Sequence, residues 1–201
     1  MGMYNFEMEL SKRRSEKNYI SEKKMYFYFQ SLIKAFSHLQ DHSIAHRDIK
    51  PENLIFCGKS YKVTDFGLAT IFSETTRSIA GTPEYHSPEI RKNYKMRDFK
   101  QIDYLKSDVF SFGLTFLEAA LLIDVKTINS SFTQNAMYSF LSILSKSNVY
   151  ASWFVEILSL MTNFDENVRP DFKTLSKFLD NLGSPSIFTS PFKEFEDKNL
   201  I

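Results

Sequence analysis

A short polar stretch, IAHRDIKPENLIF at residues 44–56, places acidic, basic and amide side chains between apolar flanks. In-line phosphoryl transfer needs a carboxylate for the attacking hydroxyl, a cation near the transferred group, and oxygen ligands for Mg²⁺. Asp48, Lys50 and Asn53 supply these three chemical groups within six residues. Pro51 stiffens the turn between them. The stretch therefore predicts a catalytic loop that acts on phosphate.

The tripeptide Asp65-Phe66-Gly67 comes directly after the second strand of a predicted hairpin. From this position the Asp65 carboxylate can face back toward Asn53 and complete an oxygen site for Mg²⁺. Phe66 is predicted to be a buried pivot. Gly67 is predicted to adopt a backbone angle that other residues avoid.

Two elements must position these side chains, a helix before the loop and a hairpin after it. Apolar residues recur at spacings of three and four through residues 21–40, with Ser21 at the N-cap, which predicts an amphipathic helix. The segments 53–56 and 61–64 are apolar, and Gly58 between them can adopt a positive φ, which predicts a β-hairpin.

The remainder of the chain divides into a loop-rich part and a helical part. Residues 68–107 contain Gly and Pro breakers and are predicted to be mostly loop. Helices are predicted near residues 108–123, 133–146, 150–162 and 171–182. The expected fold class is mainly α (α+β), a helical bundle with a small β-hairpin that carries the two polar loops.

A basic cluster lies in the loop-rich part. Its members are Arg91, Lys92, Lys95, Arg97 and Lys100. One interpretation is a solvated loop, and the other is a docking site for an acidic or phosphorylated partner.

Composition excludes several classes of protein. The chain has 201 residues, of which 43% are hydrophobic, so it can bury a core and is expected to form one domain. A net charge of +1 gives no global attraction to nucleic acid or to an anionic membrane. The single cysteine excludes a disulfide framework and fits an intracellular, cytoplasmic location. The longest apolar stretch, residues 109–123, is too short and too polar to span a bilayer.

Five motifs in order make the chain resemble the C-terminal lobe of a eukaryotic protein kinase of the Ser/Thr type. HRDIKPEN (46–53) is similar to the catalytic loop of that family and DFG (65–67) to its metal-binding motif. GTPEYHSPE (81–89) resembles the end of the activation segment, with Ser where the family usually has Ala. SDVFSFG (107–113) and NVRPDF (167–172) resemble two structural motifs of the lobe.

The resemblance implies a role for each matching residue. Asp48 would be the catalytic base and Lys50 the cation at the γ-phosphate of ATP. Asn53 and Asp65 would hold Mg²⁺. The structural positions would be His46 packing on Phe66, Gly67 beside it, Asp108 bracing the loop backbone, and Glu89 paired with Arg169.

Regulation and specificity follow from the same resemblance. Arg47 would meet a phosphate on the activation segment, and Ser78, four residues before Thr82, is a candidate phosphorylation site. Lys50 and Thr82 are typical of kinases that act on Ser or Thr of a protein substrate. Neither a nucleic acid nor a membrane is an expected partner.

The family's N-terminal lobe has no counterpart in these 201 residues. Six glycines are present and none forms Gly-x-Gly, and no strand with an ATP-binding Lys precedes residue 44. Glu7, Met8 and Ile55 are candidate nucleotide contacts, Glu7 through the ribose. A solvated Glu at a helix start is the alternative for Glu7.

Three interpretations stay open. The chain could be a fragment of a genuine kinase, a silent binding module of the pseudokinase type, or a lobe whose missing part comes from a separate segment or partner. As a fragment it is expected to bind ATP poorly on its own. A partial kinase domain is expected over residues 1–182 and a flexible tail over 183–201.

Overall fold

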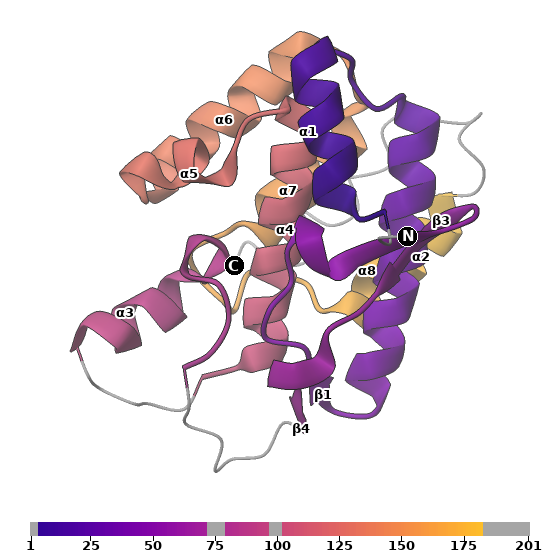
Figure 1. The fold of residues 1–201 in the computed structure, drawn as a ribbon. Coiled ribbons are helices and arrows are strands. Elements are labelled where there is room, and N and C mark those ends of the chain that lie inside the picture. The colour runs from indigo at the N-terminus through magenta and orange to yellow at the C-terminus, as the bar shows by residue number, and fades with distance from the viewer. Residues whose placement is uncertain (1–3, 72–78, 97–101, 183–201) are drawn as a thin grey trace.

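The computed structural model describes residues 4–71, 79–96 and 102–182, and helices dominate these ranges (Figure 1). The helices are α1 (Phe6–Glu16), α2 (Glu22–Asp41), α3 (Pro88–Met96), α4 (Tyr104–Leu121), α5 (Val125–Ile128), α6 (Gln134–Ser147), α7 (Ser152–Met161) and α8 (Phe172–Leu182). The strands are β1 (Ile44–Ala45), β2 (Leu54–Cys57), β3 (Ser60–Val63) and β4 (Thr70–Ile71). The expectation of a mainly helical fold with a small hairpin is confirmed.

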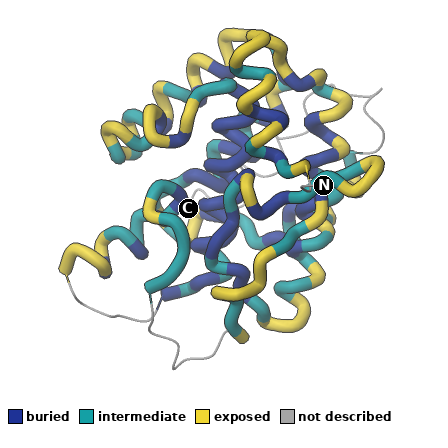
Figure 2. Tube along the Cα trace, viewed as in Figure 1, coloured by how far each residue is buried: buried dark blue, intermediate teal, exposed yellow. Residues whose placement is uncertain are grey.

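Helix α4 forms the centre of the core. Nearly all of its side chains are buried, and Figure 2 shows it as a buried column with exposed segments around it. Its run of apolar residues packs against α7, where Gly113 allows a close approach. A Cβ atom added at Gly113 would lie 2.8 Å from the Cβ of Met161. The small residue therefore sets the spacing of the two helices.

The apolar face of α2 packs onto α4 through aromatic rings. The ring of Phe29 lies 5.4 Å from Phe112, 4.9 Å from Phe116 and 5.3 Å from Phe154, measured between centroids. The helix begins at Glu22, directly after the predicted N-cap. Ser21 occupies the N-cap position, although its side chain makes no capping hydrogen bond.

Two short antiparallel pairs of strands frame the polar loops. In the hairpin, Leu54 of β2 is opposite Val63 of β3, and Gly58 in the turn has a φ of +73°. The prediction placed the first strand one residue too early and the second strand one residue too late. Strand β1 pairs with β4, with Ile44 opposite Ile71, so the chain entering the first loop lies beside the chain leaving the second.

The loop-rich assignment of residues 68–107 is wrong in part. Residues Pro88–Met96 form α3, because proline is tolerated in the first turn of a helix and does not act as a breaker there. Helix α4 begins four residues before its predicted start, since the Asp103 side chain caps it through the backbone N–H groups of Leu105 and Lys106.

The basic cluster therefore lies on a helix where it is described. Arg91 is half-buried, whereas Lys92 and Lys95 are exposed on α3, so the solvated-loop interpretation fails for Arg91. Arg97 and Lys100, together with Ser78 and the predicted tail at 183–201, lie outside the described residues.

Candidate active site

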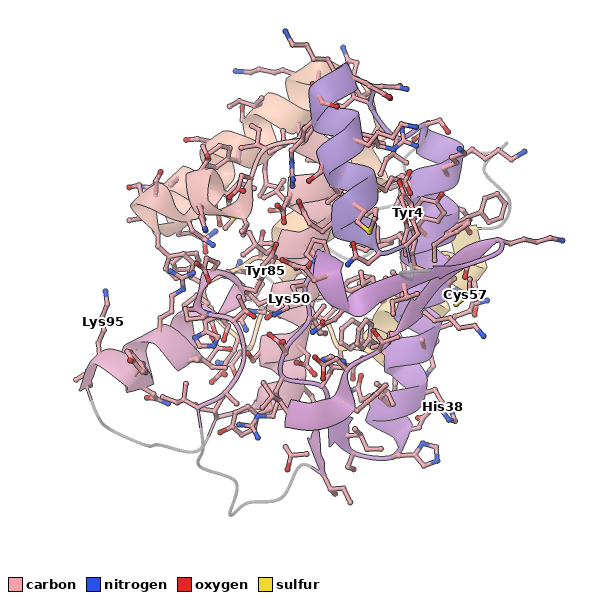
Figure 3. All side chains as sticks on the ribbon, in the orientation of Figure 1. Tyr4, His38, Lys50, Cys57, Tyr85 and Lys95 are labelled. Carbon is pink, nitrogen blue, oxygen red and sulfur yellow. The ribbon has the colours of Figure 1, made fainter. Side chains whose placement is uncertain are left out.

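The carboxylate of Asp48 lies at the meeting point of the polar loop and the segment around Thr82. One oxygen, Oδ1, accepts hydrogen bonds from the backbone N–H of Thr82 at 2.9 Å and from its hydroxyl at 2.7 Å. The other, Oδ2, accepts from the Asn53 amide at 3.0 Å and lies 3.1 Å from the Lys50 ammonium. Lys50, at the centre of the view in Figure 3, also donates to the Thr82 hydroxyl at 2.6 Å.

This environment keeps Asp48 ionised. Burial on its own raises the pKa of Asp48, but the hydrogen bonds from Thr82, Lys50 and Asn53 outweigh it and hold the pKa below the usual range of an aspartate. The carboxylate is therefore an acceptor at neutral pH, as a general base must be.

Asp108 of α4 binds the backbone at the start of the polar loop. Its two carboxylate oxygens accept the N–H groups of His46 at 2.6 Å and of Arg47 at 2.9 Å. Arg47 has a φ of +69°, a conformation that costs free energy in a non-glycine residue and that this double contact stabilises. Burial raises the pKa of Asp108 to about 7, although the two N–H donors lower it.

His46 is fully buried and joins the loop to the strand before Asp65. Its Nε2 lies 2.9 Å from the carbonyl oxygen of Thr64, and its ring lies 6.1 Å from Phe36 and 5.1 Å from Phe66. Burial lowers the pKa of His46, so the ring is neutral at pH 7. These contacts are structural.

The turn that carries the second carboxylate differs from its prediction in two ways. The left-handed residue is Asp65, with a φ of +62°, and not Gly67. Aspartate tolerates this region because its side chain bonds the local backbone, here the Gly67 N–H at 3.3 Å. Phe66 is 47% exposed and not a buried pivot, because it lies on a one-turn helix outside both hydrophobic clusters and packs against His46.

The donor atoms fit a divalent metal. The amide nitrogen of Asn53 donates to the carbonyl and the carboxylate of Asp48, so its Oδ1 oxygen is the atom that can bind a cation. Asp65 is exposed and directly follows Thr64. The backbone N–H of Thr64 donates to the Asn53 carbonyl at 3.0 Å, which links the two segments. Amide and carboxylate oxygens are the ligands that Mg²⁺ prefers. No cluster of three or more His, Cys, Asp or Glu is present in the described ranges, so such a site would rest on Asn53 and Asp65.

A buried ion pair fixes the segment that follows Thr82. Arg169 donates to both carboxylate oxygens of Glu89, at 2.7 and 2.6 Å, which is the pairing that the sequence predicts. Its guanidinium also donates to the carbonyl of Asn163 at 2.7 Å and lies 5.1 Å from the Phe110 ring centroid. Arg169 is 1% exposed, so α3 is tied to the core by a fully desolvated cation.

Two details of this segment explain residue choices. Ser87, where the resembled family usually has Ala, is fully buried and donates to the Ser107 hydroxyl at 2.9 Å, so the extra oxygen is satisfied. Gly81 has a φ of +100°, and a Cβ atom there would lie 2.2 Å from the carbonyl oxygen of Arg47. Only glycine permits this approach of the two loops.

Three other predicted residues lie where α1 meets the hairpin. Glu7 accepts hydrogen bonds from Arg14 and from Ser11, both at 2.8 Å, so its carboxylate is already engaged on its own helix. Met8 is 50% exposed, and Ile55 of β2 is half-buried and forms a bridge with Asn5.

The guanidinium of Arg47 lies 4.7 Å from the Tyr104 ring centroid.

Sequence reasoning missed one buried network. Glu118 of α4 accepts from Arg14 at 2.6 Å and from the Tyr85 hydroxyl at 2.6 Å, and it also accepts the N–H of Val125 at 3.2 Å. Burial raises the pKa of Glu118 to about 7, against the opposing effects of Tyr85 and Arg14. The available signal was a lone acidic residue inside the apolar run of α4, which must have a partner.

Comparison with known proteins gives a match along most of the chain. A family model described as protein kinase domain matches residues 3–179.

None of the helices within the described ranges is long and apolar enough to cross a membrane.

Similar curated proteins are kinases by name. The probable serine/threonine-protein kinase nek2 of Dictyostelium discoideum is 30% identical over 178 residues, which cover 83% of this chain and 40% of that protein. The probable serine/threonine-protein kinase PLK of the same organism is 30% identical over 207 residues, 96% of this chain and 20% of that protein. The serine/threonine-protein kinase chk1 of Schizosaccharomyces pombe is 36% identical over 101 residues, 47% of this chain and 19% of that protein. The chain spans less than half the length of each.

Proposed function

Because this chain belongs to the protein kinase family, we propose that it transfers the γ-phosphate of ATP to Ser or Thr side chains of a protein substrate. The observation that carries this proposal is the ionised Asp48 carboxylate with Lys50, Asn53 and Thr82 bonded around it. Each of these groups has a use in phosphoryl transfer, and the relatives named above are serine/threonine kinases.

Asp48 would orient the hydroxyl of the substrate and accept its proton. In the structure its oxygens are occupied by Thr82, Asn53 and Lys50, so a substrate hydroxyl would share Asp48 with these donors. Lys50, held by Thr82 at 2.6 Å, would place its positive charge beside the transferred group.

Asn53 and Asp65 would hold Mg²⁺, which when bound neutralises phosphate charge and orients the leaving group. Asn53 is buried and rigidly bonded, whereas Asp65 is exposed. Glu7, Met8 and Ile55 would contact the nucleotide where α1 meets β2, and Arg47 would bind a phosphate on the activation segment. Lys50 and Thr82 support Ser or Thr, and not Tyr, as the acceptor.

The test is the substitution Asp48→Asn, assayed in protein purified from its own cells with any segment or partner that accompanies it. We expect kcat for transfer from Mg·ATP to a Ser/Thr peptide to fall by about 10²–10⁴-fold, with little change in nucleotide affinity, because the base acts on the hydroxyl and not on ATP. Asp180→Asn, an exposed member of an ion pair with Lys34, is the matched control and should keep full activity.

Three outcomes decide the proposal. Unchanged turnover in Asp48→Asn would contradict the role of Asp48. Phosphotyrosine as the main product would contradict the Ser/Thr assignment. Binding of partners without any turnover in the unaltered protein would favour the silent binding module instead.

A further inference from the structure

A groove of about 520 Å³ lies between α3 and the turn after Thr82, which contributes Pro83 and His86 to its lining. Its lining includes the apolar side chains of Phe132, Phe164 and Met96. It also includes the basic side chains of Arg91, Lys92 and Lys95 from α3. Figure 1 shows α3 at the edge of the molecule, on the opposite side from α2.

The floor of the groove is preformed. The guanidinium of Arg91 lies 3.7 Å from the centroid of the Phe132 ring, and the Phe132 and Phe164 rings are 4.8 Å apart. Arg91 is held in this position because it also donates to the carbonyls of Glu84 and His86, both at 3.0 Å. A ligand entering the groove would meet a rigid cation and two ordered rings, which limits the entropy lost on binding.

The rim carries positive charge. Lys92 and Lys95 are exposed, and within the described ranges neither forms an ion pair. Figure 3 shows Lys95 extending from α3 into solvent. The residues that line the groove include no Asp or Glu. Tyr94 and Met96 beside these lysines are 71% and 62% exposed and also line the groove.

We propose that this groove docks a peptide segment of a partner protein in which carboxylates flank an aromatic side chain. The aromatic ring would pack between Phe164 and Met96, and the carboxylates would meet Lys92 and Lys95. Charge complementarity selects this occupant, because a basic or neutral peptide would leave the lysines unpaired beside the apolar side chains. This docking goes beyond phosphoryl transfer and does not depend on it.

A peptide bound in the groove would affect the turn around Tyr85, which lies next to the active site. Arg91 binds the carbonyls on either side of Tyr85, and Thr82, which precedes this turn, binds Asp48. A docked peptide would therefore contact a cation that is itself hydrogen-bonded to this turn. This chain of contacts gives the groove a physical route to substrate binding.

The experiment measures fluorescence anisotropy of the labelled peptide Gly-Glu-Glu-Phe-Glu-Glu-Gly added to the whole chain. The charge reversal Lys92→Glu with Lys95→Glu removes two cations from exposed positions, so folding should be preserved. We expect it to weaken binding by about tenfold or more. The matched control is Lys62→Glu with Lys177→Glu, which makes the same change of net charge on β3 and α8 and should bind within about twofold of the unaltered chain.

Peptide variants separate the two parts of the recognition. Replacing Phe by Ser, or every Glu by Gln, should each weaken binding by about tenfold. Equal binding of the Phe-to-Ser peptide, or equal weakening in the control pair of lysines, would show non-specific charge attraction and overturn the proposal. So would unchanged binding in the α3 variant.

The other possible occupants have their own signatures. If an unlabelled peptide of residues 190–201 displaces the probe more tightly than the unlabelled probe does, the groove belongs to this chain's own C-terminal segment. If sedimentation shows a dimer that the α3 charge reversal dissociates, the groove belongs to a second copy. Either result would overturn the assignment to a partner protein.

Discussion

The two aromatic rings that flank His46 belong to differently built halves of the candidate site. Phe36 is 2% exposed and lies 5.0 Å from Phe172 and 5.3 Å from Phe112, so it is part of the main core. Phe66 lies 5.1 Å from His46 on the other side but is 47% exposed. The half with the base is therefore backed by the core, and the half with Asp65 is not.

The same contrast holds for the carboxylates. Asp108 is 3% exposed and binds a loop 62 positions away in sequence, whereas exposed Asp65 bonds the N–H two residues later. Long-range contacts determine the shape of the catalytic loop. The turn at Asp65 lies at the surface outside the hydrophobic clusters, so it can rearrange without unfolding the domain.

The largest expected effect compares the two rings. Phe36→Ala should lower the free energy of unfolding by about 3–5 kcal/mol because it leaves a cavity among buried rings. Phe66→Ala should cost less than about 1 kcal/mol, since half of its surface is already in water. Urea denaturation of both variants checks the difference. Equal losses would show that the Phe66 ring is part of the core after all.

Next in size is the pair of carboxylates. Asp108→Asn should lower the free energy of unfolding by about 2–4 kcal/mol, because an amide NH₂ would face one of the two backbone N–H donors. The same change at exposed Asp65 should alter stability by less than about 0.5 kcal/mol while weakening Mg²⁺-dependent activity. Thermal melts of the two variants, combined with the kinase assay, test this. A stable Asp108→Asn protein would contradict the anchoring role.

Alanine at two glycines gives a smaller contrast. At Gly81 the new Cβ would collide with the Arg47 carbonyl and the φ of +100° would be strained, so about 1–3 kcal/mol should be lost. At Gly67 the nearest atom is the Asp65 carboxylate oxygen at 3.2 Å, which belongs to an exposed side chain that can move. There the loss should stay below about 1 kcal/mol. Chemical denaturation of both variants measures the two losses. A larger loss at Gly67 than at Gly81 would mean that the turn at Asp65 is the more rigid region.

The smallest effect concerns pH. It tests whether burial raises the pKa of a carboxyl group in this fold. The pKa of Glu118 is near 4.5 in an unfolded chain and about 7 in the fold, so between these values the folded protein binds more protons. Its contribution to stability therefore falls as the pH rises from 5 to 7. Relative to Glu118→Gln, the unaltered protein should lose about 1–2 kcal/mol over this interval in urea titrations at the two pH values.

A control at the surface completes the pH test. Glu16→Gln, a change at a 49% exposed side chain, controls for the loss of one negative charge. An unaltered protein whose stability changes in parallel with Glu118→Gln would show that the Glu118 carboxyl titrates normally.

Periodicity and motif spacing predicted the elements that hold the site. The apolar spacing of residues 21–40 predicted α2, and the hairpin after the loop was predicted with a turn one residue too long on each side. Both depend on contacts of near neighbours. Helix α3 was missed because Pro88 looks like a breaker in sequence, although at the start of a helix its fixed φ is favourable.

Contacts between distant segments could not be predicted from pattern alone. The stacking of Arg91 on Phe132 and the bonds of Glu118 to Arg14 join segments far apart in the chain. The pairing of Glu89 with Arg169 was expected from the family resemblance, and no periodicity indicates it. Likewise the left-handed angle at Asp65 depends on a side-chain bond that residue type only permits.

The hydrogen bonds from His46 and Arg47 to Asp108 have a consequence for protein synthesis. The acceptor is translated 62 residues after the donor, which at about 5–20 residues per second is a delay of roughly 3–12 s. Through that interval the amides of His46 and Arg47 lack the acceptor that they have in the fold. A ribosome paused before residue 108 therefore carries every residue of the catalytic loop without the carboxylate that holds its backbone.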